Sequence, residues 1–188
     1  MNVKLLPIDR VNVELLQQWQ NDASITFPLM GFRFPVQKKT IEDWLEGIRK
    51  SNGSTRVVYG IFVDGTPVGM VSLHDVDLIN KNAFYGIYIA EEKQKNKGVG
   101  FAATQLALDF AFNAMGLHRV ALEVLADNEK AIHLYKKIGC EHEGVKRQAY
   151  YMDGKFVDVH IMAILRDAFI LDPKMLPNRL ISTPFTKP

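Results

Sequence analysis

The chain has 188 residues, of which 47% are hydrophobic and 23% are charged, a composition typical of one soluble globular domain. The formal net charge of +2 is too small to favour nucleic-acid or membrane binding by bulk electrostatics. The single cysteine, Cys140, excludes an internal disulfide framework and a cysteine-based metal cluster. The sequence has no signal-like apolar segment near its start and no apolar stretch of about 18 residues. We therefore expect a cytoplasmic protein without nucleic-acid or membrane partners.

The first part of the chain predicts one strand and two helices. Residues 3–6 indicate a short strand, and apolar side chains at helical spacing predict helices over 11–20 and 40–51. The intervening segment 22–37 has no clean period and predicts a long loop, a kind of segment that is often functional.

The middle of the chain predicts three strands and a buried helix. Residues 56–63, 67–74 and 83–90 are rich in β-branched and aromatic residues and are separated by turn signals. A helix follows Gly98 and runs to about Met115. Nearly all of its side chains are apolar, which predicts that it is buried.

The last part predicts a strand over 118–125, a helix over 128–138 that ends at Gly139, and two strands over 140–151 and 156–165. Strands that alternate with helices in this order predict a mixed α/β fold with a mainly antiparallel central sheet flanked by helices.

The domain organisation follows from the same pattern. We expect a single domain over residues 1–171 and an irregular C-terminal tail over 172–188, which is rich in proline. The sequence does not decide the oligomeric state, and a homodimer stays open.

A strand, a polar loop and a glycine pair precede the buried helix. Backbone N–H groups at a helix start lack intrahelical partners, and the helix dipole adds positive potential, so the turn predicts an anion site. Gly98 and Gly100 let a phosphate approach the backbone, while Lys95 and Lys97 add positive charge. The alternative is a tight turn with a solvated lysine loop. The Walker pattern is absent, and Ala103 breaks the G-x-G-x-x-G pattern.

The segment Leu122–Cys140 resembles the GNAT family motif L-x-V-x-x-x-N-x-x-A-x-x-L-Y-x-x-x-G-F and departs from it only at Cys140, where the family usually has Phe. The glycine turn upstream resembles the family's acyl-CoA signature R/Q-x-x-G-x-G/A, with Lys95 in the Arg/Gln position. The resemblance covers residues 56–167. The stretch Gly144–Asp158 is similar to the bacterial branch of ribosomal-protein and amino-sugar acetyltransferases.

The resemblance implies a GNAT-like acyltransferase fold with acetyl-CoA as cosubstrate. In the family, one splayed strand pairs with the pantetheine amides, the turn amides hold the pyrophosphate, an asparagine contacts the pantetheine arm and a tyrosine protonates the leaving thiolate. The tyrosine corresponds to Tyr135. The residues expected to bind the cosubstrate are Ile87, Tyr88, Ile89, Lys95, Lys97, Gly98, Val99, Gly100, Phe101 and Asn128.

The residues themselves allow other roles. Tyr135 and Asn128 are two helical turns apart and project on the same side, but Tyr135 is also interpretable as a core tyrosine and Asn128 as a helix N-cap. Glu123 is the candidate general base, and its alternative is a salt-bridged strand carboxylate. Alternative candidates for the general base lie at the expected mouth of the site: Asp75, His74 and Tyr85. No pair of residues shows metal-ligand spacing.

The acceptor is expected to be a primary amine on a small molecule, and the resemblance favours a nucleotide-linked amino sugar of surface-glycan synthesis. Alternatives are a protein N-terminus, a polyamine, an aminoglycoside, or a non-catalytic acyl-CoA-binding domain. The near-neutral charge gives no support for a strongly polycationic acceptor. Phe32 and Arg33 in the loop 22–37 are expected to bind one side of the acceptor, and Tyr150 and Tyr151 the other. The alternative is that these aromatic residues only pack the loop onto the domain.

Overall fold

The computed structural model describes residues 1–31, 34–51 and 53–180. Its centre is one seven-stranded sheet in the order β1-β2-β3-β4-β5-β7-β6. Neighbouring strands are antiparallel except for β4 and β5, which are parallel. This confirms the expected mixed, mainly antiparallel fold. The strands are β1 (Val3–Pro7), β2 (Arg56–Val63), β3 (Thr66–Asp77), β4 (Asn82–Ile89), β5 (Arg119–Leu125), β6 (Glu141–Met152) and β7 (Lys155–Leu165).

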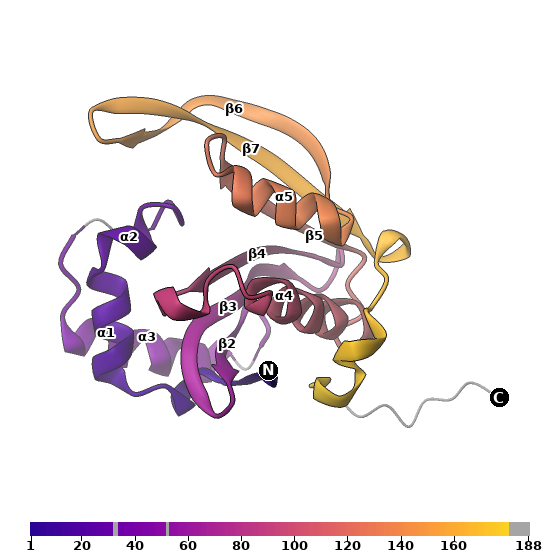
Figure 1. Cartoon of the computed structure of the whole chain (residues 1–188), viewed down its shortest axis with the longest axis horizontal. Coiled ribbons are helices and arrows are strands. Elements are labelled where there is room, and N and C mark those ends of the chain that lie inside the picture. The colour runs from indigo at the N-terminus through magenta and orange to yellow at the C-terminus, as the bar shows by residue number, and fades with distance from the viewer. Residues whose placement is uncertain (32–33, 52, 181–188) are drawn as a thin grey trace.

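Helices cover both faces of the sheet, and each face has its own hydrophobic core (Figure 1). Side chains alternate between the faces along a strand. Ile61 and Tyr85 therefore belong to one core, whereas Phe62 and Tyr88 belong to the other. The first core is covered by α4 (Val99–Asp109) and α5 (Glu129–Ile138). The second is covered by α1 (Val13–Asn21), α2 (Ala23–Thr26) and α3 (Lys38–Ser51).

Helix α4 is the predicted buried helix, and its sequence explains its position. Ala103 and Leu106 are completely buried in the first core, as expected for a helix that is apolar on nearly every side. The α-helical part ends at Asp109, and the chain continues as a wider π turn in which the Met115 amide donates to the Phe110 carbonyl at 3.0 Å. No helix in the described ranges is long and apolar enough to span a membrane.

The segment expected to be a long loop contains a short helix. Residues Ala23–Thr26 form α2, because the Asp22 side chain accepts a hydrogen bond from the Ser24 amide at 2.8 Å and caps the helix start. Four residues are too few to show a helical period in the sequence. The prediction of an irregular segment over 22–37 is therefore wrong at its start.

The expectation of an irregular tail is also wrong for Pro173–Asn178, which form a 3-10 helix. Two polar side chains of α4 hold it. Gln105 accepts a hydrogen bond from the Asp172 amide at 2.8 Å, and Arg179 donates to both carboxylate oxygens of Asp109 at 2.7 and 2.8 Å. Gln105 and Asp109 on α4 thus form the site at which the tail packs.

Candidate active site

The two parallel strands at the centre of the sheet separate after a short ladder. β4 and β5 pair only over Asn82–Phe84 and Arg119–Ala121. The outer edges of the two strands are already paired with β3 and β7. Beyond the ladder, the backbone N–H and C=O groups that residues 85–89 turn towards β5 have no ladder partner among the described strands. They can pair with a ligand that carries amides in an extended conformation.

Alternation along β4 gives this opening two different sides. Tyr85, Ile87 and Ile89 pack in the core under α4 and α5, whereas Tyr88 packs in the core under α1 to α3. Phe84, one residue before Tyr85, faces the same side as Tyr88. The opening therefore connects the α4–α5 side of the sheet with the α1–α3 side.

The start of α4 borders the opening on the α4–α5 side. Gly98 caps the helix in a left-handed conformation with φ of 83°. The first helical hydrogen bond runs from the Ala102 amide to the Gly98 carbonyl at 3.0 Å. Within the described chain, the amides of residues 99–101 donate no backbone hydrogen bond. A side chain at Gly98 would meet no atom within 4 Å, and one at Gly100 would first meet Leu134 at 3.6 Å. This free space in front of open amides suits a phosphate.

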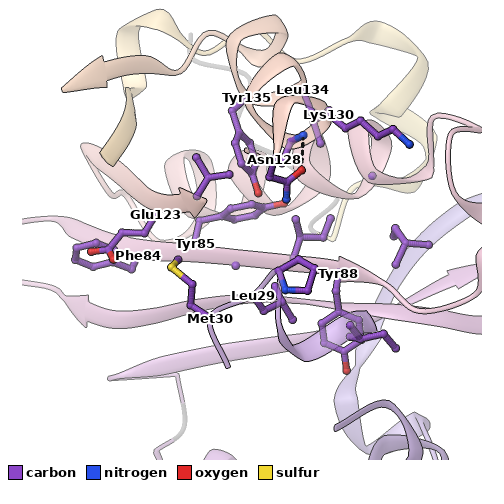
Figure 2. Close-up of a pocket in the computed structure, with 18 of the residues that line it drawn as sticks. Leu29, Met30, Phe84, Tyr85, Tyr88, Glu123, Asn128, Lys130, Leu134 and Tyr135 are labelled. Carbon is purple, nitrogen blue, oxygen red and sulfur yellow. Dashed lines mark hydrogen bonds between the residues drawn. The ribbon is translucent and has the colours of Figure 1, made fainter. Parts of the chain in front are cut away.

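Helix α5 supplies two polar side chains to the opening. The Asn128 side-chain oxygen accepts a hydrogen bond from the Ala131 amide at 3.2 Å and caps the helix, so the N-cap role is confirmed and the side-chain NH₂ group stays available. Tyr135 lies two turns later and is 7% exposed. Its hydroxyl makes no hydrogen bond with another described residue. Figure 2 shows Asn128, Tyr135 and Tyr85 converging on the same space.

A hydrogen-bonded chain ties the Tyr85 ring to the start of α4. Thr104 donates to the Gly100 carbonyl at 2.7 Å, and its oxygen lies 2.7 Å from the Tyr85 hydroxyl. Because the single Thr104 proton is already used, Tyr85 is the donor. The edge of one tyrosine ring faces the other, with the Tyr85 and Tyr135 centroids 6.3 Å apart. Tyr85 thus fixes the position of Tyr135.

Burial makes the hydroxyl of Tyr135 a weak acid. Removal from water disfavours the charged phenolate and raises the pKa of Tyr135 above its ordinary value. The pKa of Tyr85 is raised as well, for the same reason. Both hydroxyls are therefore protonated at neutral pH, and the Tyr135 proton has no acceptor among the described residues.

The α1–α3 side of the opening carries an imidazole among charged groups. Burial lowers the pKa of His74, and the nearby Arg56 guanidinium lowers it further. Asp75 and Glu123 act in the opposite direction because they stabilise the imidazolium. The net effect is a lowered pKa for His74, so the imidazole is neutral at neutral pH.

Three residues around His74 shape this side. Phe84 stacks on the His74 ring, with centroids 6.0 Å apart and planes inclined by 26°. Glu123 on β5 forms an ion pair with Lys146 on β6. Asp75 is exposed at a β-bulge, where its φ of 49° is rare for a residue with a side chain. The bulge turns the Asp75 carboxyl group to the rim.

These elements enclose one cleft of about 730 Å³ that extends through the opening. One end lies between the α4 start and α5, and the other lies at His74, Phe84 and Glu123. Figure 2 places Met30 and Leu29 along the lower wall of the cleft, opposite Tyr135. A cleft with an anion site, a free strand edge and a buried hydroxyl along one path can hold a long ligand with a phosphate at one end and a reacting group near Tyr135.

Comparison with known proteins decides what this arrangement is. A family profile described as the acetyltransferase (GNAT) domain matches residues 2–141, most of the chain. The chain belongs to the GNAT acetyltransferase family. It is therefore an N-acetyltransferase that uses acetyl-CoA as its cosubstrate and an amine as its acceptor.

Individual relatives of this acetyltransferase are named for different activities. The chain is 28% identical to spermidine N(1)-acetyltransferase of Escherichia coli K12, over 92% of this chain and 91% of the relative. It is 33% identical to the putative ribosomal N-acetyltransferase YdaF of Bacillus subtilis, over 67% of each chain. The crystal structure of spermidine N-acetyltransferase from Vibrio cholerae with CoA and spermine superposes with a TM-score of 0.79 at 23% identity, over 88% of this chain and 96% of that chain. That structure supports the fold.

Apart from the hairpin tyrosines, the site residues predicted for this acetyltransferase fall into three groups. Those that line the cleft are Asp75, Tyr85, Ile87, Tyr88, Ile89, Lys95, Gly100, Glu123, Asn128 and Tyr135. Gly98, Val99, Lys97 and Phe101 lie beside the lining at the α4 start, where Phe101 packs under the Lys137 ammonium. Phe32 and Arg33 lie outside the described residues. The roles assigned to all of these side chains stay predictions.

The positions of Tyr150, Tyr151 and Tyr85 differ from those expected from the sequence. Tyr150 and Tyr151 are not among the cleft-lining residues, and Tyr151 packs on Phe156 of the neighbouring strand, with ring centroids 5.1 Å apart. Tyr85 is 4% exposed and lies inside the cleft rather than at its mouth. The reason is alternation along β4, which turns Tyr85 towards α4 and leaves Phe84 on the α1–α3 side.

The cleft-lining residues that sequence reasoning missed include Met30, Phe84 and Lys130. Phe84 could have been found from its position next to Tyr85 in a strand. Lys130 could have been found from its place in the first turn of α5, beside the Asn128 cap. Met30 adopts a φ of 54°, and no pattern in the sequence indicates this conformation.

Proposed function

We propose that this acetyltransferase acetylates a primary amine carried by a small molecule, which approaches from the α1–α3 side of the cleft. Acetyl-CoA supplies the activated acetyl group as a thioester. The amine nitrogen forms a bond to the acetyl carbon and the carbon–sulfur bond breaks. One proton leaves the nitrogen and one proton is delivered to the departing sulfur. The chain must therefore supply a proton acceptor on one side of the opening and a proton donor on the other.

The observation that carries the proposal is the position of Tyr135. Its buried hydroxyl borders the cleft beside a splayed strand edge and a phosphate-sized turn. A raised pKa keeps this proton in place until a strong base such as a thiolate forms nearby. Tyr135 thus fits the role of general acid for the departing sulfur. Asn128 offers its side-chain NH₂ group to the amide-bearing arm of the cosubstrate.

His74 fits the role of general base better than Glu123 does. The imidazole is neutral at neutral pH because burial lowers the pKa of His74, so its lone pair can accept a proton. The carboxylates of Asp75 and Glu123 then stabilise the imidazolium that forms. Glu123 is already engaged by the Lys146 ammonium, which favours its charged form and weakens it as a base. Glu123 remains the alternative.

Two acceptor classes have support. A polyamine is supported by the relatives named spermidine N(1)-acetyltransferase. The carboxylates of Asp75 and Glu123 would also attract the ammonium groups of a polyamine. A nucleotide-linked amino sugar is supported by the C-terminal segment Gly144–Asp158, whose sequence resembles that of amino-sugar acetyltransferases, and by the cationic Arg56, which lies opposite His74 on the neighbouring strand.

Thiol release tests the proposal. Wild-type protein is mixed with acetyl-CoA and one amine at a time: spermidine, a UDP-linked 4-amino sugar, a dTDP-linked 4-amino sugar, an amino acid, and a peptide with a free N-terminus. We expect amine-dependent release of CoA with at least one of the small molecules. Turnover with the peptide alone would contradict a small-molecule acceptor, and no turnover with any amine would contradict catalysis.

A further inference from the structure

A second cavity adjoins the acceptor end of the cleft. It has a volume of about 340 Å³ and lies where α1 and α3 incompletely cover strands β2 and β3. Trp44 of α3 and Arg56 of β2 are among its walls, together with Met70 and Ser72 of β3. His74 lines both this cavity and the catalytic cleft. A ligand whose amine lies at His74 can therefore extend into the second cavity.

The junction between the two cavities is kept open by a glycine. Gly86 lines the catalytic cleft and pairs with Ser72 across β3 and β4. A Cβ atom at Gly86 would lie 3.4 Å from the Ser72 hydroxyl and 3.9 Å from the His74 ring. A larger side chain at this position would fill the passage, since both neighbours line the second cavity.

The described lining of the second cavity contains one charged residue, the exposed and cationic Arg56. Arg56 is the directly opposed cross-strand partner of His74, so the two side chains leave the same face of the sheet close together. No carboxylate belongs to the described lining. In the part of the chain that the structure describes, Arg56 forms no ion pair. Ion pairs hold Arg49, Arg119 and Arg179, whereas the described residues Arg10, Arg147 and Arg166, like Arg56, form none.

Other groups along this cavity can also bind a polar ligand. Gln20, Thr40 and Ser72 provide an amide and two hydroxyls in the lining, and Trp44 provides an aromatic face.

We propose that the second cavity binds an anionic group of the acceptor, with Arg56 as its anchor. The inference rests on the proposed function and narrows it: the acceptor is an amine that also carries a phosphate or a carboxylate, rather than a polycation. A guanidinium forms paired hydrogen bonds with either anion. A polyamine would instead bring its second ammonium group towards the unpaired Arg56 guanidinium, where like charges repel.

The test compares acceptor kinetics for wild type, Arg56→Ala and a control, Arg166→Ala. Arg166 is exposed in a 3-10 helix outside both cavities, so its loss changes the net charge equally. With a nucleotide-linked amino sugar or an amino acid as acceptor, Arg56→Ala should raise the acceptor KM by about 10- to 100-fold. The kcat and the KM for acetyl-CoA should stay unchanged, and Arg166→Ala should behave as wild type. Whichever of the two acceptors shows the effect identifies the anion as phosphate or carboxylate.

A second variant tests the path between the cavities without removing a charge. Gly86→Val should raise the KM of the same anionic acceptor by a larger factor than it raises the dissociation constant of CoA, measured by calorimetry, because Gly86 also lies on the strand edge that borders the cosubstrate. Spermidine as the preferred acceptor, with a KM that Arg56→Ala does not raise, would overturn the inference and leave acetyl transfer to a small amine intact. An anionic acceptor whose KM is the same for Arg56→Ala and wild type would overturn the inference as well. If no amine is turned over, the proposed function itself is contradicted.

Discussion

Replacing Gly100 with aspartate should separate cosubstrate binding from folding. Gly100 is the second residue of α4, and a Cβ atom there would have its nearest contact at 3.6 Å, with Leu134, an ordinary van der Waals distance. Replacing a helical glycine with alanine stabilises a helix by about 0.5–1 kcal/mol, and aspartate, a poorer helix former than alanine, gains a smaller part of this. A carboxylate in the first turn adds about 0.3–1 kcal/mol through the helix dipole. The variant should therefore be at least as stable as wild type.

The same carboxylate should repel the pyrophosphate of CoA. Like charges about 4 Å apart near a protein surface repel by about 4 kcal/mol. Even after screening halves this value, the affinity falls by about 30-fold or more. Gly100→Asn is the matched control, because it adds nearly the same bulk without the charge, and it should lose much less affinity.

The assay is calorimetric titration of CoA, with a thermal melt of each variant to confirm folding. We expect Gly100→Asp to bind CoA about 30-fold more weakly than wild type, or not measurably, at an unchanged or higher Tm. CoA affinity equal to that of wild type in a folded Gly100→Asp protein would refute the assignment of the α4 start as the pyrophosphate site.

Two other predictions concern the base and the tail. The acid limb of the kcat/KM profile should have a pKa below the ordinary histidine value of about 6.5, since the lowered pKa of His74 keeps the imidazole neutral and active to lower pH. His74→Gln should abolish this limb and Glu123→Gln should retain it, whereas the reverse would assign the base to Glu123. Arg179→Ala should lower the free energy of unfolding by about 2–4 kcal/mol, because it leaves the buried Asp109 carboxylate without its charged partner. Urea unfolding checks this, and an unchanged midpoint would show that the tail contributes nothing.

Local patterns in the sequence were sufficient for much of the fold and part of the site. Gly98 and Gly139 mark the start of α4 and the end of α5 because each adopts a left-handed conformation, with φ of 83° and 105° that glycine accepts without strain. Asn128 precedes a helix and caps it. Each of these features depends on residues within one turn, which the sequence displays directly.

Non-local contacts explain what the sequence did not reveal. The tail packs on α4 through the ion pair between Arg179 and Asp109. The sequence around either residue does not indicate that the two pair. Arg56 lies opposite His74 only through the register of the β2–β3 hairpin, which includes a bulge between Ile61 and Phe62. A shift of one residue would have turned Arg56 to the other face. The cavity that they share could not be anticipated without the strand pairing.

The most direct test of the account is the turnover of Tyr135→Phe. This change removes only a buried hydroxyl that makes no hydrogen bond with the described residues, so the Tm and the affinity for CoA should stay at their wild-type values. Loss of a general acid typically costs about 10²- to 10⁴-fold in rate, and we expect kcat for the preferred amine to fall within that range. A folded Tyr135→Phe protein that binds CoA and releases it from acetyl-CoA at the wild-type rate would contradict catalysis by Tyr135.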